Sequence, residues 1–350
     1  MKTWLFFPLL VLIPFLSKGQ NINKLNLSGN YGFIIPHSSE LVPVSNTSPY
    51  GATLGYQWMR TDEEAWNVCN CFHYLGVQAS YHNFGNPSVL GSALNLVGTF
   101  EPLLWQKNRL SLSLQTGIGI SYLTQIHDPV NNPENLFFSA PISFLLFVTP
   151  RIGYQIDKEW EVNLEFAYNH ISNGGQRQPN KGINYPMLGL GISKYFNLID
   201  LPQYQAGTLD KRINSYLETG LNTRYSEEEG RRKPSISLLA GLYKGVTNVN
   251  AFGAGIELTK DFSLKVENSR LEALMPAPFV AHHFLFGRFD FSQRFAWYAN
   301  KPEGYHDHNF YQRYALQYLI NDHLRVGFSL KTHGHVAENI DLRVGWVVGR

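Results

Sequence analysis

The strongest constraint on this 350-residue sequence is an alternation of apolar and polar residues with a period of two. In residues 110–122 the even positions are mostly large and apolar, whereas the odd positions are serine, glycine or glutamine. The same split recurs at 50–58, 162–169 and 340–348. Because successive side chains of a strand point to opposite faces, each segment predicts a strand with one apolar and one polar face.

The length and the ends of these segments indicate strands that cross a membrane. They run to about ten to thirteen residues, as tilted bilayer-spanning strands do, whereas strands of soluble proteins average about five or six. Their apolar rows often end in Tyr, Trp or Phe, which is typical of the aromatic girdles at membrane interfaces. We therefore predict an all-β fold, an antiparallel transmembrane β-barrel of the bacterial outer membrane.

The pattern also gives an approximate strand count. We predict eight strands between residues 26 and 196, the first at 26–35, and about six to eight further strands from 213 to 348. Periodicity does not count barrels, so the second group can belong to the same barrel or to a second one. The expected organisation is therefore a first barrel region at 20–200, which contains the active site proposed below, and an additional strand region at 201–350.

Composition sets further limits on the function. With 44% hydrophobic and 16% charged residues the chain is not disordered, and a net charge of +2 gives no electrostatic attraction to nucleic acid. The expected partners are outer-membrane lipids, and a homodimer remains possible.

The N-terminal segment resembles an export signal. Lys2 precedes the apolar run 4–16, and the small residues Ser17 and Gly19 follow it. This predicts a signal peptide at 1–19, removed near the Gly19–Gln20 bond, and a mature protein in the outer membrane of a Gram-negative cell.

Two cysteines and several paired histidines give weak signals. Cys69 and Cys71 fit neither a redox Cys-x-x-Cys motif nor a zinc pattern, and a local disulfide is possible although one-residue spacing strains it. Histidine pairs such as His282 and His283 lack carboxylate or cysteine partners at ligand spacing. We assign no redox role, no metal site and no cofactor.

The alternation is interrupted where polar side chains enter an apolar row. The lipid-facing row at 162, 164, 166 and 168 continues into His170 and Ser172, and the parity of the next strand places Asn184 on the same face. An antiparallel hairpin would bring the three side chains together. These residues can instead mark the point where the strand leaves the hydrocarbon for the head-group region.

The three residue types can form a catalytic triad. His170 could accept the proton of the Ser172 hydroxyl while Asn184 holds the other ring nitrogen. Backbone N–H groups of Asn173, Gly174 and Gly175, or the Asn173 amide, could bind the oxyanion. With a periplasmic N-terminus the seventh strand ascends, so these groups would face the outer leaflet, which consists of lipopolysaccharide. The substrate would then be an ester within the membrane.

The stretch 170–184, His-Ile-Ser-Asn-Gly-Gly-Gln-Arg-Gln-Pro-Asn-Lys-Gly-Ile-Asn, resembles the active-site segment of the lipid A 3-O-deacylase family (PagL, acyloxyacyl-hydrolase-like). That family carries His-x-Ser-Asn, then a Pro-Asn-x-Gly turn, then an acid twelve residues after the serine. The resemblance implies an eight-stranded barrel in 20–200 that deacylates lipid A. It also implies His170 as base, Ser172 as nucleophile, Asn173 for the oxyanion and Asn180 for shaping the loop.

One position departs from the family, which leaves alternatives open. Asn184 replaces the usual Glu and cannot offset the positive charge of the histidine. The segment is also similar to outer-membrane phospholipase A, whose triad is Ser-His-Asn and which depends on calcium and dimerisation. A third alternative is a noncatalytic barrel or channel, in which polar lumen positions such as Asn163, Glu165, Arg325 and Arg343 line a pore.

Overall fold

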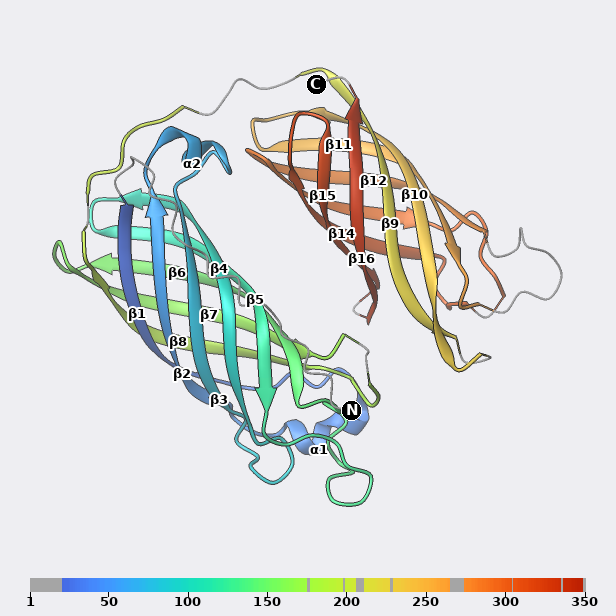
Figure 1. The fold of residues 1–350 in the computed structure, drawn as a ribbon, viewed down its shortest axis with the longest axis horizontal. Coiled ribbons are helices and arrows are strands. Elements are labelled where there is room, and N and C mark those ends of the chain that lie inside the picture. Colours follow the sequence, from blue (N-terminus) through green and yellow to red (C-terminus); the bar gives the residue numbers. More distant parts are fainter. Residues whose placement is uncertain are drawn as a thin grey trace, which may run out of the picture. The chain divides into compact units, whose positions relative to one another are not determined.

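A computed structural model describes residues 21–174, 177–197, 199–205, 211–226, 229–264, 274–303, 305–334 and 336–348. The predicted signal peptide at 1–19 lies outside these residues. The described strands form two closed antiparallel barrels of eight strands each, one drawn in blue to green and the other in yellow to red (Figure 1). The all-β prediction is confirmed, and the open question of one barrel or two is answered with two.

The first barrel is a simple meander in which each strand pairs with the next along the chain. It closes where β1 pairs with β8, from Lys24 opposite Tyr195 to Gly32 opposite Met187. Its strands are β1 (Asn21–Gly32), β2 (Tyr50–Arg60), β3 (His73–Asn83), β4 (Ser92–Lys107), β5 (Leu110–Leu123), β6 (Ile142–Gln155), β7 (Trp160–Ser172) and β8 (Ile183–Tyr195).

The second barrel repeats this arrangement and closes where β16 pairs with β9. The sequence predicted six to eight further strands in this region, and the described residues form eight. They are β9 (Ile213–Ser226), β10 (Arg231–Gly245), β11 (Asn250–Asp261), β12 (Leu274–Phe286), β13 (Phe289–Trp297), β14 (Phe310–Leu319), β15 (Leu324–His333) and β16 (Val336–Val348).

Each barrel belongs to a separate compact unit, and residues 63–72 belong to the second unit. The short helices are η1 (Ser39–Leu41) and α1 (Val42–Ser45) between β1 and β2, and α2 (Glu63–Asn67) between β2 and β3. In the part of the chain that the structure describes, no helix is long and apolar enough to cross a membrane.

The two ends of the first barrel differ in their connections. One end carries the long connections 33–49, 84–91, 124–141 and 173–182, and we call it the loop end. The opposite end has tight turns at 108–109 and 156–159, together with the longer connection 61–72. Because β7 runs toward the loop end, its last residues lie at that rim.

The two faces of the strands follow the predicted parity. Along β5 the even positions Ile118, Ile120 and Tyr122 are exposed, whereas Ser113 and Ser121 are buried. The outer wall is therefore apolar. The lumen is polar, with an ion-paired cluster of Lys24, Glu101, Arg151 and Glu165.

The first strand is displaced from its predicted position of 26–35. The strand starts at Asn21, because the alternation of buried and exposed side chains already begins there, with Ile22 and Lys24 pointing inward. Its ladder with β2 ends at Tyr31, opposite Tyr50. The apolar row nevertheless continues outward through Phe33 and Ile35, which are exposed. The sequence pattern therefore extends beyond the regular strand.

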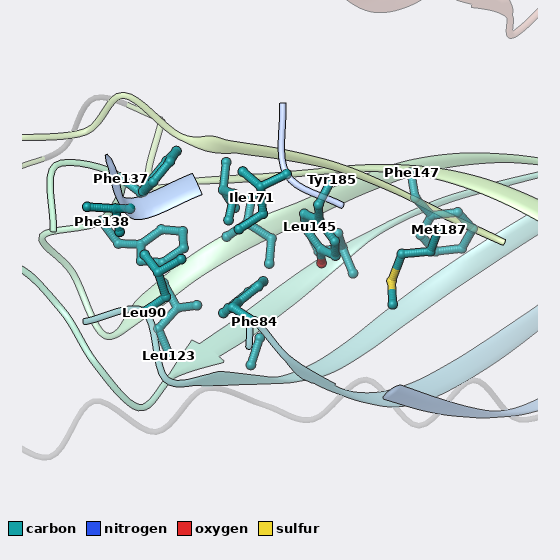
Figure 2. Close-up of a cluster of buried hydrophobic side chains, with 14 of the residues drawn as sticks. Phe84, Leu90, Leu123, Phe137, Phe138, Leu145, Phe147, Ile171, Tyr185 and Met187 are labelled. Carbon is teal, nitrogen blue, oxygen red and sulfur yellow. The ribbon is translucent and has the colours of Figure 1, made fainter. Parts of the chain in front are cut away.

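A buried apolar cluster closes the loop end of the first barrel (Figure 2). Phe137 and Phe138 from the 124–141 connection pack with Phe84, and none of the three is exposed to solvent. Ile171 and Ile183 belong to the same cluster from the ends of β7 and β8. The long connections are thus folded onto the barrel, which fixes the segment that contains the predicted site.

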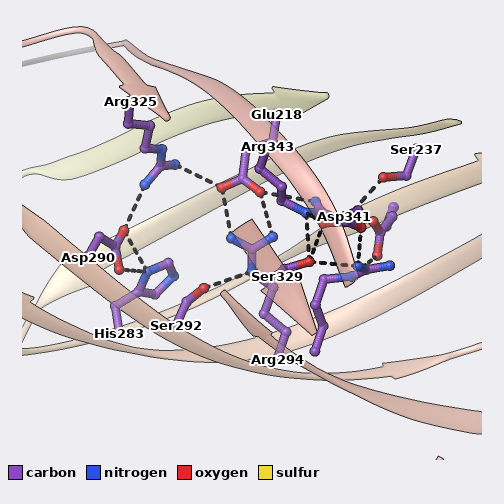
Figure 3. Close-up of polar contacts among 12 residues, drawn as sticks. Glu218, Ser237, His283, Asp290, Ser292, Arg294, Arg325, Ser329, Asp341 and Arg343 are labelled. Carbon is purple, nitrogen blue, oxygen red and sulfur yellow. Dashed lines mark hydrogen bonds and ion pairs between the residues drawn. The ribbon is translucent and has the colours of Figure 1, made fainter. Parts of the chain in front are cut away.

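Ion pairs cross the lumen of the second barrel (Figure 3). Glu218 accepts two hydrogen bonds from Arg294, at 2.6 and 2.8 Å, and is also paired with Arg325 and Arg343. Arg325 reaches Asp290 at 2.7 Å. Arg325 and Arg343, considered above as pore-lining residues, are each 1% exposed.

The two cysteines form a disulfide, with their Cα atoms 5.1 Å apart. Among the described residues, Cys69, Cys71 and His73 bring atoms that could bind a metal within 4.8 Å of one another. Both sulfur atoms are used by the disulfide, so they offer no thiolate for a metal.

Candidate active site

The predicted site residues lie at the loop-end rim, on the outer wall of the first barrel. On β7 the exposed row Leu164, Phe166 and Tyr168 leads into His170 and Ser172, which are half-buried. The pairing of β7 with β8 places Asn184 directly opposite His170. Two polar side chains of one strand and one of its neighbour therefore share the apolar outer face, as the parity predicted.

His170 and Asn184 are joined by a hydrogen bond of 2.7 Å between Nδ1 and Oδ1. A carboxamide oxygen only accepts, so the ring Nδ1 carries the proton and donates it. The other ring nitrogen, Nε2, is then unprotonated and can accept a proton. This is the tautomer that a histidine base requires.

Gly182, in the turn before β8, lies close to the side chains of both His170 and Ser172. A Cβ atom added to Gly182 would lie 2.9 Å from His170 Cε1 and 3.2 Å from Ser172 Cβ. The residue has a φ of +67°, a conformation that favours glycine. Within the described residues Ser172 and His170 are not hydrogen-bonded, which is common at catalytic pairs without substrate.

The loop 173–182 is organised by two asparagines. Asn173 is buried, and its side-chain amide donates to Ser139 Oγ at 3.3 Å and to the Arg177 carbonyl at 2.9 Å. Its backbone N–H donates to Asn180 Oδ1 at 3.0 Å. The Asn173 donors thus hold the loop, whereas no protein partner of the Asn180 amide nitrogen is found among the described residues.

The two glycines after Asn173 are only partly described. Gly174 is exposed with a φ of +66°, and a Cβ there would meet nothing within 4 Å. Gly175 lies outside the described residues.

The 124–141 connection supports this loop from below. Phe137 accepts a hydrogen bond of 3.1 Å from the Gly182 N–H, and Leu136 accepts one of 3.1 Å from the Lys181 N–H. Because Phe137 is part of the buried cluster, the turn that positions His170 is fixed to the core of the loop end.

The β1–β2 connection borders the site on its other side. Phe33 N–H donates to the Pro186 carbonyl at 3.2 Å, and Ile35 N–H donates to the Asn184 carbonyl at 2.8 Å. The backbone of Asn184 is thereby paired with a segment that lies far away in the sequence.

An ion pair fixes the same connection. Lys181 and Glu40 are paired, and the hydrogen bond from the Lys181 ammonium lowers the pKa of the Glu40 carboxyl. The connection is therefore tied to the turn that contains Gly182.

Sequence reasoning did not identify Gly182, His37 or the Lys181–Glu40 pair as parts of the site. Gly182 could have been identified from the sequence, because it is the glycine of the Pro-Asn-x-Gly turn. His37 could have been identified as well, because it continues the odd, outward-facing row of β1. The Lys181–Glu40 pair joins residues 141 positions apart and has no local signature.

Both barrel regions match known protein-family models. Residues 50–193 match the family described as Lipid A 3-O-deacylase (PagL). Residues 211–350 match the family described as Acyloxyacyl hydrolase, C-terminal domain. Each barrel region thus matches a PagL-related family model. The PagL match spans β2 to β8 and contains every predicted site residue, and the protein is an outer-membrane β-barrel.

Two similar solved structures have low sequence identity to this chain. The crystal structure of the outer membrane enzyme PagL is 16% identical, with 47% of this chain and 97% of that chain covered and a TM-score of 0.35. Neisserial surface protein A is 9% identical, with coverages of 50% and 97% and a TM-score of 0.33. The comparison with curated proteins found no match.

Proposed function

We propose that this protein is an outer-membrane esterase that removes an ester-linked acyl chain from lipid A, with Ser172, His170 and Asn184 as its triad. The observation that carries the proposal is the bond between His170 Nδ1 and Asn184 Oδ1, on an outward-facing row that also holds Ser172. Three polar groups in this arrangement on an apolar wall suit an ester that is already in the membrane.

The reaction follows from the tautomer of His170. Ser172 Oγ attacks the ester carbonyl while its proton passes to His170 Nε2, and a tetrahedral oxyanion forms. The sugar oxygen then leaves and takes that proton, which yields an acyl-enzyme. Water repeats the sequence with His170 as base and releases the fatty acid. Asn184 orients the ring throughout but adds no negative charge to stabilise the imidazolium.

For the oxyanion we favour Asn180 and the backbone of Gly174 over the side chain of Asn173. The Asn173 amide is committed to Ser139 and Arg177, whereas Asn180 has its oxygen fixed by the Asn173 N–H and an amide nitrogen left to donate. A donor held in place before the reaction stabilises the developing charge without reorganisation. Gly175, also considered above, lies outside the described residues.

We also propose that the loop end faces the cell exterior. Long external loops and short periplasmic turns are the habit of such barrels, and the loop end carries four long connections. The triad would then meet the outer leaflet. The second barrel supplies no outward His-x-Ser pair in its described residues, so we assign the reaction to the first barrel alone.

The test is hydrolysis by the purified, refolded full-length protein and its Ser172→Ala variant. Both are incubated with lipid A and, separately, with phospholipid, with and without calcium, and the products are read by mass spectrometry. Loss of a hydroxyacyl chain from lipid A by the wild type alone is the expected result. Absence of any serine-dependent product from folded protein would refute the proposal.

A second candidate is a phospholipase A, which Asn184 favours because an amide in the third triad position is that enzyme's pattern. Serine-dependent release of fatty acid from phospholipid, but not from lipid A, would move the assignment there.

A further inference from the structure

The extended outer row of β1 brings a histidine beside the triad. Ile35 pairs with Asn184 through its backbone, and the chain continues in the antiparallel sense toward the turn before β8. Two residues on from Ile35 is His37, and two residues back from Asn184 is Gly182. His37 is therefore expected opposite Gly182 and on the outward face.

The absence of a side chain at Gly182 leaves the two imidazoles as neighbours. The Cβ position of Gly182 lies 2.9 Å from the ring of His170, and His37 interacts electrostatically with that ring. His37 is exposed at the rim. It cannot replace Asn184 as the partner of His170 Nδ1, because Asn184 already fills that position.

The charge around His37 indicates the chemistry of its ligand. Arg177 and Lys181 are basic residues of the adjoining 173–182 loop, and Arg177 is exposed. Glu40 is the acid tied to this loop, and it is paired with Lys181. The named charges of this loop and its partner are therefore two cations and one anion, and this balance suits a phosphate at the rim beside Ser172.

We propose that His37 binds a phosphate of the lipid A head group while the ester lies at Ser172, an inference that rests on the proposed function. The sugars of lipid A carry phosphates as well as acyl esters, so both groups can be engaged in one complex. Arg177 adds positive charge beside the phosphate, and the Lys181–Glu40 pair holds the connection that presents His37. This makes His37 a specificity residue rather than a member of the triad.

The experiment measures binding separately from catalysis. Affinity for lipid A is measured in detergent micelles with the full-length Ser172→Ala variant, and compared with the same chain that also carries His37→Ala. The matched control adds His308→Ala, an exposed histidine of the second unit. Circular dichroism melting verifies that each variant is folded.

The expected result is a dissociation constant about tenfold higher for His37→Ala, as the loss of a charge-assisted hydrogen bond predicts, and an unchanged value for the control. With enzymatically dephosphorylated lipid A the His37 effect should vanish. With phosphatidylglycerol, whose phosphate is a diester, His37→Ala should also change nothing.

Three outcomes would overturn the proposal. An unchanged affinity for lipid A would remove the contact, and an equal loss with dephosphorylated lipid A would remove the phosphate. An equal loss with phosphatidylglycerol would make the site a general one for lipid phosphates. Failure of the proposed function has a different signature, because the active-serine chain would then release no acyl chain even if phosphate-dependent binding persists.

Discussion

The substitution Gly182→Ala tests whether the turn before β8 sets the position of His170, the proposed catalytic base. The added Cβ would lie 2.9 Å from His170 Cε1, well inside the roughly 3.5–4.0 Å at which carbon atoms are in favourable contact. The ring cannot simply rotate away, because Nδ1 is bonded to Asn184. It must therefore shift by several tenths of an ångström, or the bond must break.

The magnitude has a backbone part and a catalytic part. An alanine forced into the left-handed region costs about 1–2 kcal/mol of stability. A displacement of about 1 Å at a reacting group can cost about 10²-fold in rate, or roughly 2.7 kcal/mol of activation free energy. We expect kcat for acyl release from lipid A to fall by about ten- to a hundredfold in folded protein.

Gly334→Ala is the matched control for the backbone part. Gly334 has a φ of +62°, and a Cβ there would meet nothing within 4 Å. The Gly334→Ala variant should lose about as much stability as Gly182→Ala, as measured by thermal unfolding. Its kcat, measured by fatty-acid release, should equal that of the wild type. A Gly182→Ala enzyme with wild-type kcat would refute the argument that this glycine fixes the base.

Four further outcomes are expected. Asn184→Ala should lower kcat by about 10²-fold or more, because nothing then holds His170 in the tautomer with a proton on Nδ1. Asn184→Asp should raise kcat, because a carboxylate stabilises the imidazolium. Equal kcat values for the wild type and these two variants would contradict the triad. Glu218→Ala should destabilise the second barrel by about 3–5 kcal/mol, because its buried arginine partners lose their counter-charge; an unchanged unfolding midpoint would count against this. The intact protein should give no conductance steps in a planar bilayer, since ion pairs cross the lumen, and stable steps would revive the channel alternative. Because the pKa of Glu40 is lowered, its ion pair with Lys181 persists as the pH falls through the ordinary carboxyl range and is lost only below it. Proteolysis of the connection 33–49 should therefore be equally slow at about pH 7 and about pH 5. The Glu40→Gln variant should be cut faster at both pH values.

The sequence predicted the faces of the strands better than their ends. Alternation is a local property, so the outward row from Leu164 to Ser172 and the opposite position of Asn184 could be read directly. The predicted end of β1 was wrong because its outward row continues through Ile35, beyond Gly32, the last residue of the regular strand. A periodic pattern reports which way side chains point, whereas strand ends depend on the partner strand.

The parts of the site that could not be predicted depend on contacts between distant segments. Asn173 is turned inward by Ser139 of another connection, which leaves Asn180 as the freer donor. His37 reaches the site because its connection pairs with β8 through Ile35. Such contacts are set by how the loops fold over the buried cluster, and no short-range pattern records them. The number of barrels could not be predicted for the same reason. Closure of each barrel depends on which later strand pairs with its first strand, β8 with β1 and β16 with β9.

The outward placement of His170, Ser172 and Asn184 on the barrel wall has a kinetic consequence. A substrate for these groups would arrive by lateral diffusion within the leaflet rather than from the aqueous phase. The quantity that saturates such an enzyme is the mole fraction of substrate among the surrounding lipids. Diluting lipid A with an inert amphiphile at fixed total substrate should therefore slow the reaction, and bulk concentration alone should not restore it.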